Sequence, residues 1–295
     1  MPIMRDARFM IGGLNYAVTC ADGAEAFEIP DTYLPFISDD AASIDFQLTL
    51  RGGAIPHWSG ELLFDSHGPW RLWRSDKKYL ISLHSRIYGE APFQIAIIEP
   101  DFSAGTTFIE NAPPVREPGC FPFSYPLDEV LSINLLACGH GLEVHASGVS
   151  DGGDGYLFLG VSGSGKSTFS RLWDADEDVI VLSDDRIIIT EREGGFWIHG
   201  TPWHGDAGLA DPAGVPLKAV FFISHADVNS ASSLKPAQVA SRLMARSFPT
   251  FWNEDGMRFS TGLAAGVATA LPGFEMGFVP EPPAVEYVRN LVSGG

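Results

Sequence analysis

The chain has 295 residues, enough for one large domain or two ordinary ones, and 45% of them are hydrophobic, which is ample for a core. Its formal charge of −18 at pH 7 argues against nucleic acid or an anionic membrane as a general partner. No N-terminal segment resembles a signal peptide and no apolar run is long enough to span a bilayer, so the sequence predicts a cytoplasmic protein.

The cysteine pattern gives no sign of a cross-linked or zinc-bound scaffold. Cys20, Cys120 and Cys138 are odd in number, widely spaced and free of any CxxC pair. This pattern argues against a disulfide framework and against a structural zinc site.

The first 110 residues read as strands separated by turn residues. Several runs alternate apolar and polar side chains, which is typical of half-buried strands. We therefore expect an antiparallel sheet or a small sandwich without recognisable chemistry. The expected strands are Phe9–Thr19, Ile44–Leu50, Gly60–Phe64, Trp70–Trp73, Tyr79–Leu83, Phe93–Ile98 and Thr106–Ile109.

A proline-rich joint follows the predicted strands. Prolines and turn residues gather between Asn111 and Pro122, which favours a domain boundary there. The sequence thus predicts a β-rich N-terminal domain over residues 1–118 and a second domain over residues 119–295. Apolar residues at helical spacing then predict a helix over Leu127–Cys138.

The next elements lead into the most informative stretch of the chain. Leu142–Val149 reads as a strand, and the turn Asp151–Gly155 joins it to a buried strand, Tyr156–Leu159. A helix is expected from Thr168 to Trp173, and a further buried strand over Val179–Leu182. The two predicted buried strands therefore enclose a loop and a helix.

That loop, Gly160–Ser167, matches the phosphate-binding pattern GxxxxGK[ST]. Its glycines permit left-handed turns, so that backbone N–H groups converge on an anion at the start of a helix. In this pattern Lys166 reaches the β- and γ-phosphates, and the Ser167 hydroxyl binds Mg²⁺. The residues expected to bind ATP are Gly160, Ser162, Gly163, Ser164, Gly165, Lys166, Ser167 and Thr168.

Two acidic residues end the next predicted strand. Adjacent strand residues point to opposite faces, so Asp184 and Asp185 can serve different purposes. We expect one of them to face the metal and the other to face an acceptor group.

Beyond this point the chain reads as a hairpin, Arg186–Thr190 with Gly195–His199, followed by the polar loop Gly200–Asp206. His204 and Asp206 are candidates for the acceptor side, and the alternative for both is a tight turn closed by local hydrogen bonds. The remaining expected elements are a strand, Val215–Ile223, and two helices, Pro236–Phe248 and Pro283–Val292.

The segment from His145 to Asp185 resembles the catalytic domain of HPr kinase/phosphorylase, a bacterial protein-serine kinase. More distantly, it is similar to the nucleotide-binding part of ATP-dependent phosphoenolpyruvate carboxykinase. The matching stretches are Val144–Gly148, Gly160–Ser167 and Val181–Arg186. The resemblance implies an α/β (α+β) chain in which an N-terminal antiparallel β-rich domain precedes a P-loop domain with a mixed sheet flanked by helices.

The resemblance also implies roles for single residues. Lys166 would hold the phosphates, Ser167 and Asp184 would support Mg²⁺, and Asp185 would be the general base. His145 would lie close to the transferred phosphate or to the base, and the alternative is a core histidine with satisfied hydrogen bonds.

The sequence departs from HPr kinase/phosphorylase in one place. The metal-binding Glu of that family is not evident in the corresponding stretch Ile198–Asp206, where His204 and Asp206 are the candidate replacements. The reverse phosphorylase reaction and HPr as acceptor are therefore left open. Relatives of this general type also include kinases of small ribosomally made peptides.

These observations predict Mg²⁺–ATP-dependent phosphoryl transfer to a hydroxyl, most simply a serine of a protein or peptide. One alternative is an ATP-binding or sensing module without transfer activity. Another is a carboxykinase-like enzyme acting on a small carboxylate, for which the basic candidates are Arg186, Arg242, Arg246 and Arg258. The sequence leaves open the acceptor, the nucleotide base and whether the chain forms a homo-oligomer.

Overall fold

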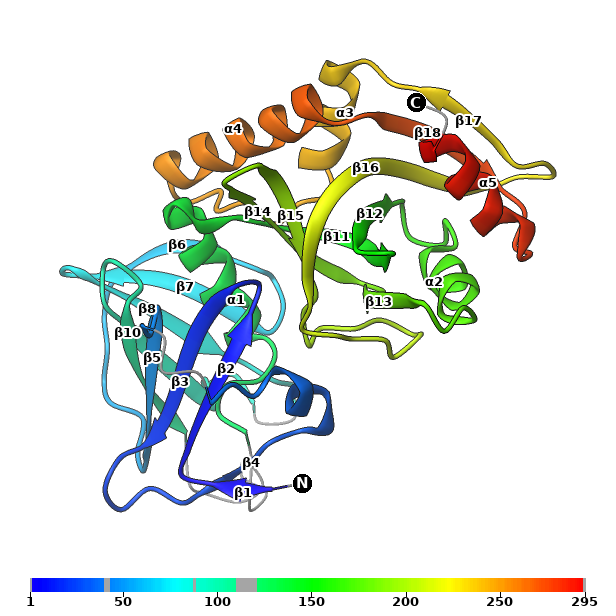
Figure 1. The fold of residues 1–295 in the computed structure, drawn as a ribbon. Coiled ribbons are helices and arrows are strands. Elements are labelled where there is room, and N and C mark those ends of the chain that lie inside the picture. The colour runs from blue at the N-terminus through cyan, green and yellow to red at the C-terminus, as the bar shows by residue number, and fades with distance from the viewer. Residues whose placement is uncertain (1, 40–42, 87–88, 110–120, 294–295) are drawn as a thin grey trace. The chain divides into compact units, whose positions relative to one another are not determined.

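The computed structural model describes residues 2–39, 43–86, 89–109 and 121–293. Contacts divide the chain into two compact units (Figure 1): Met1–Met10 with Leu14–Cys138, and Ile11–Gly13 with Gly139–Gly295. The predicted boundary between residues 118 and 119 lies outside the described residues. The helix expected over Leu127–Cys138 belongs to the first unit by its contacts.

In the first unit, eight of the described strands form one sheet in the order β2-β3-β5-β10-β9-β8-β7-β6. A separate pair joins β1 (Ile3–Met4) to β4 (Phe27–Glu28). The strands of the large sheet are β2 (Asp6–Ile11), β3 (Leu14–Cys20), β5 (Phe46–Gly52), β6 (Glu61–Asp65), β7 (Trp70–Ser75), β8 (Lys78–Leu83), β9 (Gln94–Ile98) and β10 (Ala104–Ile109).

The prediction of an antiparallel sheet is wrong for two of its strand pairs. Strand β5 runs parallel to both β3 and β10. Two parallel neighbours need a crossover connection between them. The segment between β3 and β5, which includes the 3₁₀ helix Asp31–Phe36, brings the chain back to the edge of the sheet at which β3 began. The single strand expected over Phe9–Thr19 is in fact two strands, β2 and β3.

Aromatic side chains fill the core of the first unit. Phe9, Tyr33 and Phe121 are mutually in contact, with the Tyr33 and Phe121 ring centroids 5.0 Å apart. Helix α1 (Leu127–Leu135) is tied to the same unit by a hydrogen bond of 3.0 Å between the Tyr16 and Ser132 hydroxyls. These contacts explain why α1 clusters with the N-terminal strands.

The second unit is built on a mixed sheet whose two longest strands, β11 and β16, each have two sets of neighbours. The N-terminal part of β11 pairs with β14, and its C-terminal part pairs with β12 and β13. Strand β16 pairs with β15 at its start and then with β12 and β18, both in parallel. The strands are β11 (Leu142–Asp151), β12 (Asp154–Leu159), β13 (Val179–Ser183), β14 (Arg186–Arg192), β15 (Gly195–His199), β16 (Gly214–His225), β17 (Ser230–Ser233) and β18 (Gly273–Phe278).

Helices cover both faces of this sheet (Figure 1). Helices α3 (Pro236–Met244) and α4 (Glu254–Ala270) pack against one apolar cluster, and α2 (Lys166–Asp174) and α5 (Pro283–Ser293) pack against the other. Strand β12 supplies both clusters by strict alternation, because Leu157 and Leu159 face α3 and α4 whereas Tyr156 and Phe158 face α2 and α5. The mixed sheet flanked by helices is confirmed.

Most predicted elements of this unit are present. Both predicted hairpins form, and β13 follows α2 as expected. The helix expected over Pro236–Phe248 is shorter and ends at Met244. Helix α4 was missed entirely, as were β17 and β18. In the described part of the chain no helix combines the length and apolar character needed to cross a membrane.

Candidate functional site

The Gly160–Ser167 loop leaves the buried end of β12 and enters α2 at Lys166. Gly163 and Gly165 have φ of 78° and 93°, a left-handed conformation that disfavours other residues. Gly160 is needed for a different reason, since a Cβ there would lie 2.0 Å from the Ser164 Oγ atom. The glycine pattern thus reflects real backbone constraints.

The start of α2 makes this loop suitable for an anion. Gly165 is the N-cap, and the Phe169 N–H already donates to its carbonyl oxygen at 2.8 Å. The first N–H groups of a helix lack partners within the helix, and the helix dipole places partial positive charge at the same end. A phosphate in front of the loop would meet both.

Lys166 is buried beside the loop, and its Nζ donates to the Gly160 carbonyl oxygen at 3.1 Å. Burial lowers the pKa of Lys166; the negative charge of Asp185 opposes this, whereas Arg246 and Arg186 lower the pKa further. The ammonium group therefore lies among other cations in a partly desolvated place. A polyanionic ligand would stabilise this arrangement.

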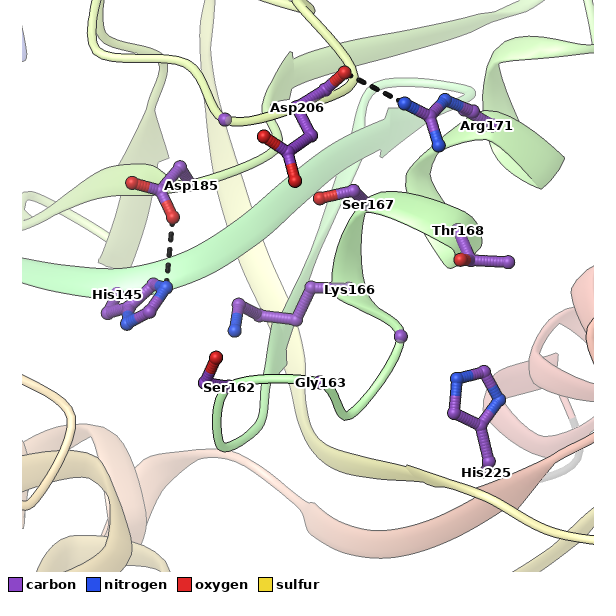
Figure 2. A pocket seen from close by; sticks show the side chains of 12 residues that line it. His145, Ser162, Gly163, Lys166, Ser167, Thr168, Arg171, Asp185, Asp206 and His225 are labelled. Carbon is purple, nitrogen blue, oxygen red and sulfur yellow. Dashed lines mark hydrogen bonds and ion pairs between the residues drawn. The ribbon is translucent and has the colours of Figure 1, made fainter.

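A cavity of about 510 Å³ opens in front of the loop (Figure 2). It brings together eight of the eleven residues predicted to bind ATP or Mg²⁺ or to act in catalysis, and the other three, Gly160, Ser164 and Asp184, do not line it. Its lining residues are His145, Ser162, Gly163, Gly165, Lys166, Ser167, Thr168, Arg171, Asp185, Gly205, Asp206 and His225.

Asp185 is held at this cavity between two basic side chains. The Nε2 atom of His145 lies 2.9 Å from Asp185 Oδ1, and the Arg186 guanidinium contacts Oδ2. Burial raises the pKa of Asp185, but the His145 hydrogen bond and the positive charge of Arg186 outweigh it, so the pKa lies below its ordinary value. Asp185 is consequently ionised at neutral pH.

Asp184 points the other way and is almost completely buried, although both aspartates lie in the two-residue bend between β13 and β14 and not on a strand as predicted. Its Oδ1 accepts from the Gly205 N–H at 2.8 Å, and its Oδ2 accepts from the Ala207 N–H at 2.9 Å. Both oxygens thus fix the backbone on either side of Asp206. The structure gives Asp184 a role in holding this loop.

Asp206, one of the two residues proposed for the acceptor side, lines the cavity beside the phosphate loop. Figure 2 shows its carboxylate and the Ser167 hydroxyl pointing toward one another. Its backbone oxygen accepts from Arg171 at 2.8 Å, which ties the loop to α2. His204 does not line the cavity, and its ring contacts the Gly205 carbonyl oxygen at 3.0 Å, which is the local turn contact named as its alternative.

The donors at this point suit Mg²⁺ better than a transition metal. Ser167 and Asp206 offer oxygen atoms, and Mg²⁺ is commonly held by one or two carboxylates together with substrate phosphates and water. No group of three or more His, Cys, Asp or Glu side chains forms a metal cage within the residues that the structure describes. Ser167 and Asp206 therefore fit a cation that arrives with a phosphate ligand.

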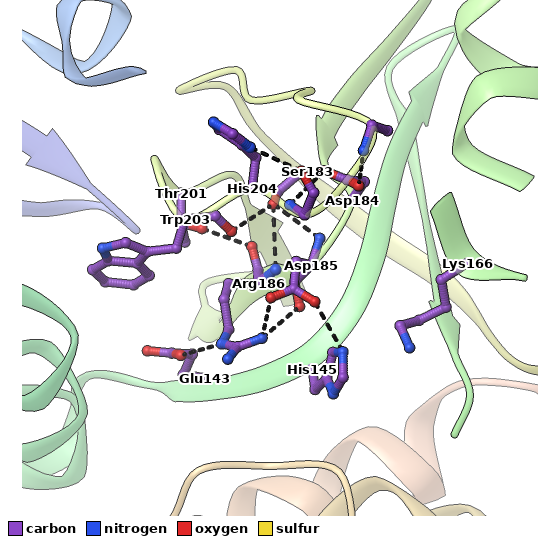
Figure 3. A network of polar contacts seen from close by, with 12 residues as sticks. Glu143, His145, Lys166, Ser183, Asp184, Asp185, Arg186, Thr201, Trp203 and His204 are labelled. Atoms are coloured by element: carbon purple, nitrogen blue, oxygen red, sulfur yellow. Dashed lines mark hydrogen bonds and ion pairs between the residues drawn. The ribbon is translucent and has the colours of Figure 1, made fainter. Parts of the chain in front are cut away.

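Arg186 is itself anchored, as Figure 3 shows. Its Nε lies 3.4 Å from an oxygen of Glu143, whose side chain is fully buried, and its guanidinium lies 4.4 Å from the centre of the Phe248 ring. The Thr201 hydroxyl donates to its backbone oxygen at 2.8 Å. These contacts fix the guanidinium that holds Asp185.

Sequence reasoning missed Arg171 and His225 as cavity residues. His225 ends β16 and Arg171 lies in the last turn of α2, and neither belongs to a motif. The signal for His225 was its position two residues after the predicted apolar strand Val215–Ile223, because ligands bind at the carboxyl ends of strands in open α/β sheets. Arg186 and Arg246, named earlier only for a carboxylate substrate, both lie close enough to Lys166 to lower its pKa.

A family model described as "ScmC: SynChlorMet cassette protein ScmC" matches residues 130–262, less than half of the chain. The matched stretch includes the loop, His145, Asp185 and Asp206, and the description names no reaction. A search of the curated proteins finds no match. The chemistry of this site therefore rests on its own residues.

Proposed function

We propose that the second unit is an HPr kinase-like P-loop domain that transfers the γ-phosphate of Mg²⁺–ATP to a hydroxyl group, in the simplest case a serine of a protein or peptide. The observation that carries this proposal is the His145–Asp185 pair, with 2.9 Å between Nε2 and Oδ1, on the same cavity as Lys166 and Ser167. A phosphate-binding loop alone would support nucleotide binding. An ionised carboxylate facing that loop supports transfer.

The loop orients the nucleotide in this proposal. Its N–H groups and the N-terminus of α2 hold the α- and β-phosphates, and Lys166 reaches the β- and γ-phosphates. Arg246 and Arg186 add positive charge near Lys166. Positioning and charge neutralisation of this kind account for most of the catalysis in phosphoryl transfer.

Asp185 then acts as the general base. The acceptor oxygen forms a bond to the γ-phosphorus as the bond to the bridging oxygen of ADP breaks, and the hydroxyl proton passes to the Asp185 carboxylate. A carboxylate of low pKa can serve because the proton leaves late in a loose transition state. His145 holds the carboxylate by a hydrogen bond, and Arg186 fixes its other oxygen.

Ser167 and Asp206 are the residues that would hold Mg²⁺. A bound Mg²⁺ neutralises charge on the β- and γ-phosphate oxygens. Asp184 contributes indirectly by fixing the backbone around Asp206 through the Gly205 and Ala207 N–H groups. The role expected for Asp184 is thereby modified, because in this proposal Asp184 positions the metal-binding loop without contacting the metal.

A small-molecule phosphotransferase is the second candidate, because Arg186 and Arg246 both lie near Lys166, although they are distant in sequence. Such cations suit a substrate carboxylate. Of the other two arginines considered for this role, Arg258 pairs with Glu254 and Asp255 on α4, and Arg242 pairs with Glu275. Of the four arginines that the sequence offered for a substrate carboxylate, only Arg186 and Arg246 therefore remain as candidates.

Transfer of labelled γ-phosphate in a lysate of the source organism, with Mg²⁺ and with Lys166→Ala as the control variant, tests the proposal. A labelled protein or peptide band that appears only with the unaltered protein is the expected result. Label confined to a small metabolite would favour the second candidate. ATP binding without any transfer would overturn the kinase proposal in favour of a sensing module.

A further inference from the structure

The cavity has a second end that the proposed transfer chemistry does not use. His145 and Asp185 lie at one end, beyond the Lys166 ammonium group, whereas Thr168 and His225 lie at the other, across the backbone of the loop (Figure 2). The lining is thus continuous from the proposed base to His225.

The topology of the sheet places His225 at this end. His225 is the last residue of β16, which runs parallel to both β12 and β18. Parallel strands end at the same edge of a sheet, and ligands bind at such carboxyl edges in open α/β sheets. His225 therefore emerges beside the loop that follows β12.

One face of the His225 ring packs against the ring of Phe278. Phe278 is the registered partner of His225 on β18, and the two ring centroids lie 5.0 Å apart with 33° between the ring planes. Phe278 is fully buried and also contacts Phe169 of α2, with 4.7 Å between centroids. His225 itself is exposed, so its ring is fixed on one side and open on the other.

The same ring lies directly against the phosphate loop. A Cβ on Gly165 would be 2.6 Å from His225 Nε2 and 2.8 Å from Phe278 Cζ. Gly165 is the residue immediately before the first turn of α2. A group stacked on His225 would thus be adjacent to a phosphate held by the loop.

The direction of the nucleotide follows from the loop. Lys166 reaches the β- and γ-phosphates, so the chain of phosphates runs from Lys166 back along the loop amides toward the α-phosphate. The nucleoside must continue away from Asp185, toward Thr168 and His225. We propose that the His225 ring is the stacking surface for the nucleobase; this rests on the proposed function, because it takes the ligand to be a nucleoside triphosphate.

Stacking of a base on an aromatic side chain contributes about 5- to 150-fold in affinity by alanine substitution, and it tolerates different bases because every base has a π face. Inorganic tripolyphosphate carries the phosphate chain without the base. The ratio of its dissociation constant to that of ATP therefore isolates the contribution of the nucleoside.

Calorimetric titration of the full chain with Mg²⁺–ATP and with Mg²⁺–tripolyphosphate tests the proposal. His225→Ala should lower the ratio at least about fivefold and leave the tripolyphosphate constant unchanged. His225→Phe keeps a flat ring and should restore most of the ratio. Lys166→Ala should weaken both ligands and leave the ratio unchanged.

An unchanged ratio in His225→Ala would overturn the proposal, and so would a loss of tripolyphosphate affinity equal to the loss of ATP affinity. If the unaltered protein bound neither ligand, the proposed function itself would fail and the stacking surface would fail with it. If ATP bound and only the ratio were insensitive to His225, the kinase proposal would stand while this inference would not.

Discussion

The side chains of His145 and Asp185 are in contact, with 2.9 Å between Nε2 and Oδ1, although the two residues are 40 positions apart in the chain. The register of the sheet makes this contact, since β11 and β14 pair in antiparallel fashion and His145 is the partner of Arg186, the residue after Asp185. A carboxylate held in this way is fixed in place before any ligand arrives. Pre-organisation of this kind is what phosphoryl transfer requires.

Arg186 is expected to set the pH range of activity. Its charge helps to lower the pKa of Asp185, so its replacement by Met should raise that pKa. The acidic limb of the kcat/KM profile should then move to higher pH, because the base is protonated at a higher pH than before. The measurement is a pH profile of transfer for both proteins.

Arg258→Met is the matched control, because Arg258 pairs with Glu254 and Asp255 on α4. It should leave the profile in place. If the rate of Arg186→Met fell equally at all pH values and the acidic limb did not move, Arg186 would have only a structural role and would not set the pKa of Asp185.

Gly160 is expected to tolerate no side chain. In Gly160→Ala the new Cβ would meet Ser164 Oγ at 2.0 Å and the Ile223 carbonyl oxygen at 3.0 Å, so the loop must shift. Overpacking of this kind costs about 1–3 kcal/mol of stability, and we expect ATP binding to weaken because the loop N–H groups move with the backbone. Gly262→Ala on α4 has nothing within 4 Å of the added Cβ and should bind ATP normally. Equal affinities for the two variants would contradict the loop geometry.

Asp206 is expected to govern the Mg²⁺ requirement. Asp206→Asn removes the charge that faces Ser167, so the Mg²⁺ concentration for half-maximal transfer should rise, while saturating Mg²⁺ should restore much of the rate. The measurement is a Mg²⁺ titration of transfer at fixed ATP. An unchanged midpoint would place the metal on other ligands.

His199 is expected to destabilise the protein in mild acid. It is buried, its Nε2 lies 2.9 Å from the Thr190 hydroxyl, and burial lowers its pKa from 6.5 to about 4. Because the unfolded chain takes up this proton near pH 6.5 and the folded chain only near pH 4, stability should fall across that window by about 3 kcal/mol and not further below it.

The test compares urea unfolding of the unaltered protein and His199→Gln between pH 7.5 and pH 4. The variant should be less stable at pH 7.5 but should lose less stability on acidification, and the difference between the two slopes isolates this one group. Parallel slopes would show that His199 is already charged in the folded protein.

The sequence anticipated the parts of the fold that depend on local pattern. The loop Gly160–Ser167, the strand before it and the helix after it are all local features, and each is present. Helix α4 was missed because Gly256, Gly262 and Gly266 interrupt its helical pattern. Gly266 has a tertiary explanation, since a Cβ there would lie 2.9 Å from the Phe196 ring.

Less of the site could be predicted from the sequence, because its remaining residues come together only through strand register. His225 reaches the loop because β16 is parallel to β12, and Asp206 reaches Ser167 because Asp184 fixes the neighbouring N–H groups. The parallel pairs of β5 in the first unit were missed for the same reason. Neither parallel strand pairing nor a contact between a side chain and a distant backbone N–H group can be recognised from the local sequence pattern.

The most direct test of the central claim is a parallel measurement of ATP binding and γ-phosphate transfer in the unaltered protein and in Asp185→Asn. The account predicts that the variant binds Mg²⁺–ATP with nearly unchanged affinity while transfer falls by about 10²- to 10⁴-fold, the usual contribution of a general base. Transfer at the unaltered rate in Asp185→Asn would contradict the assignment of Asp185 as the base.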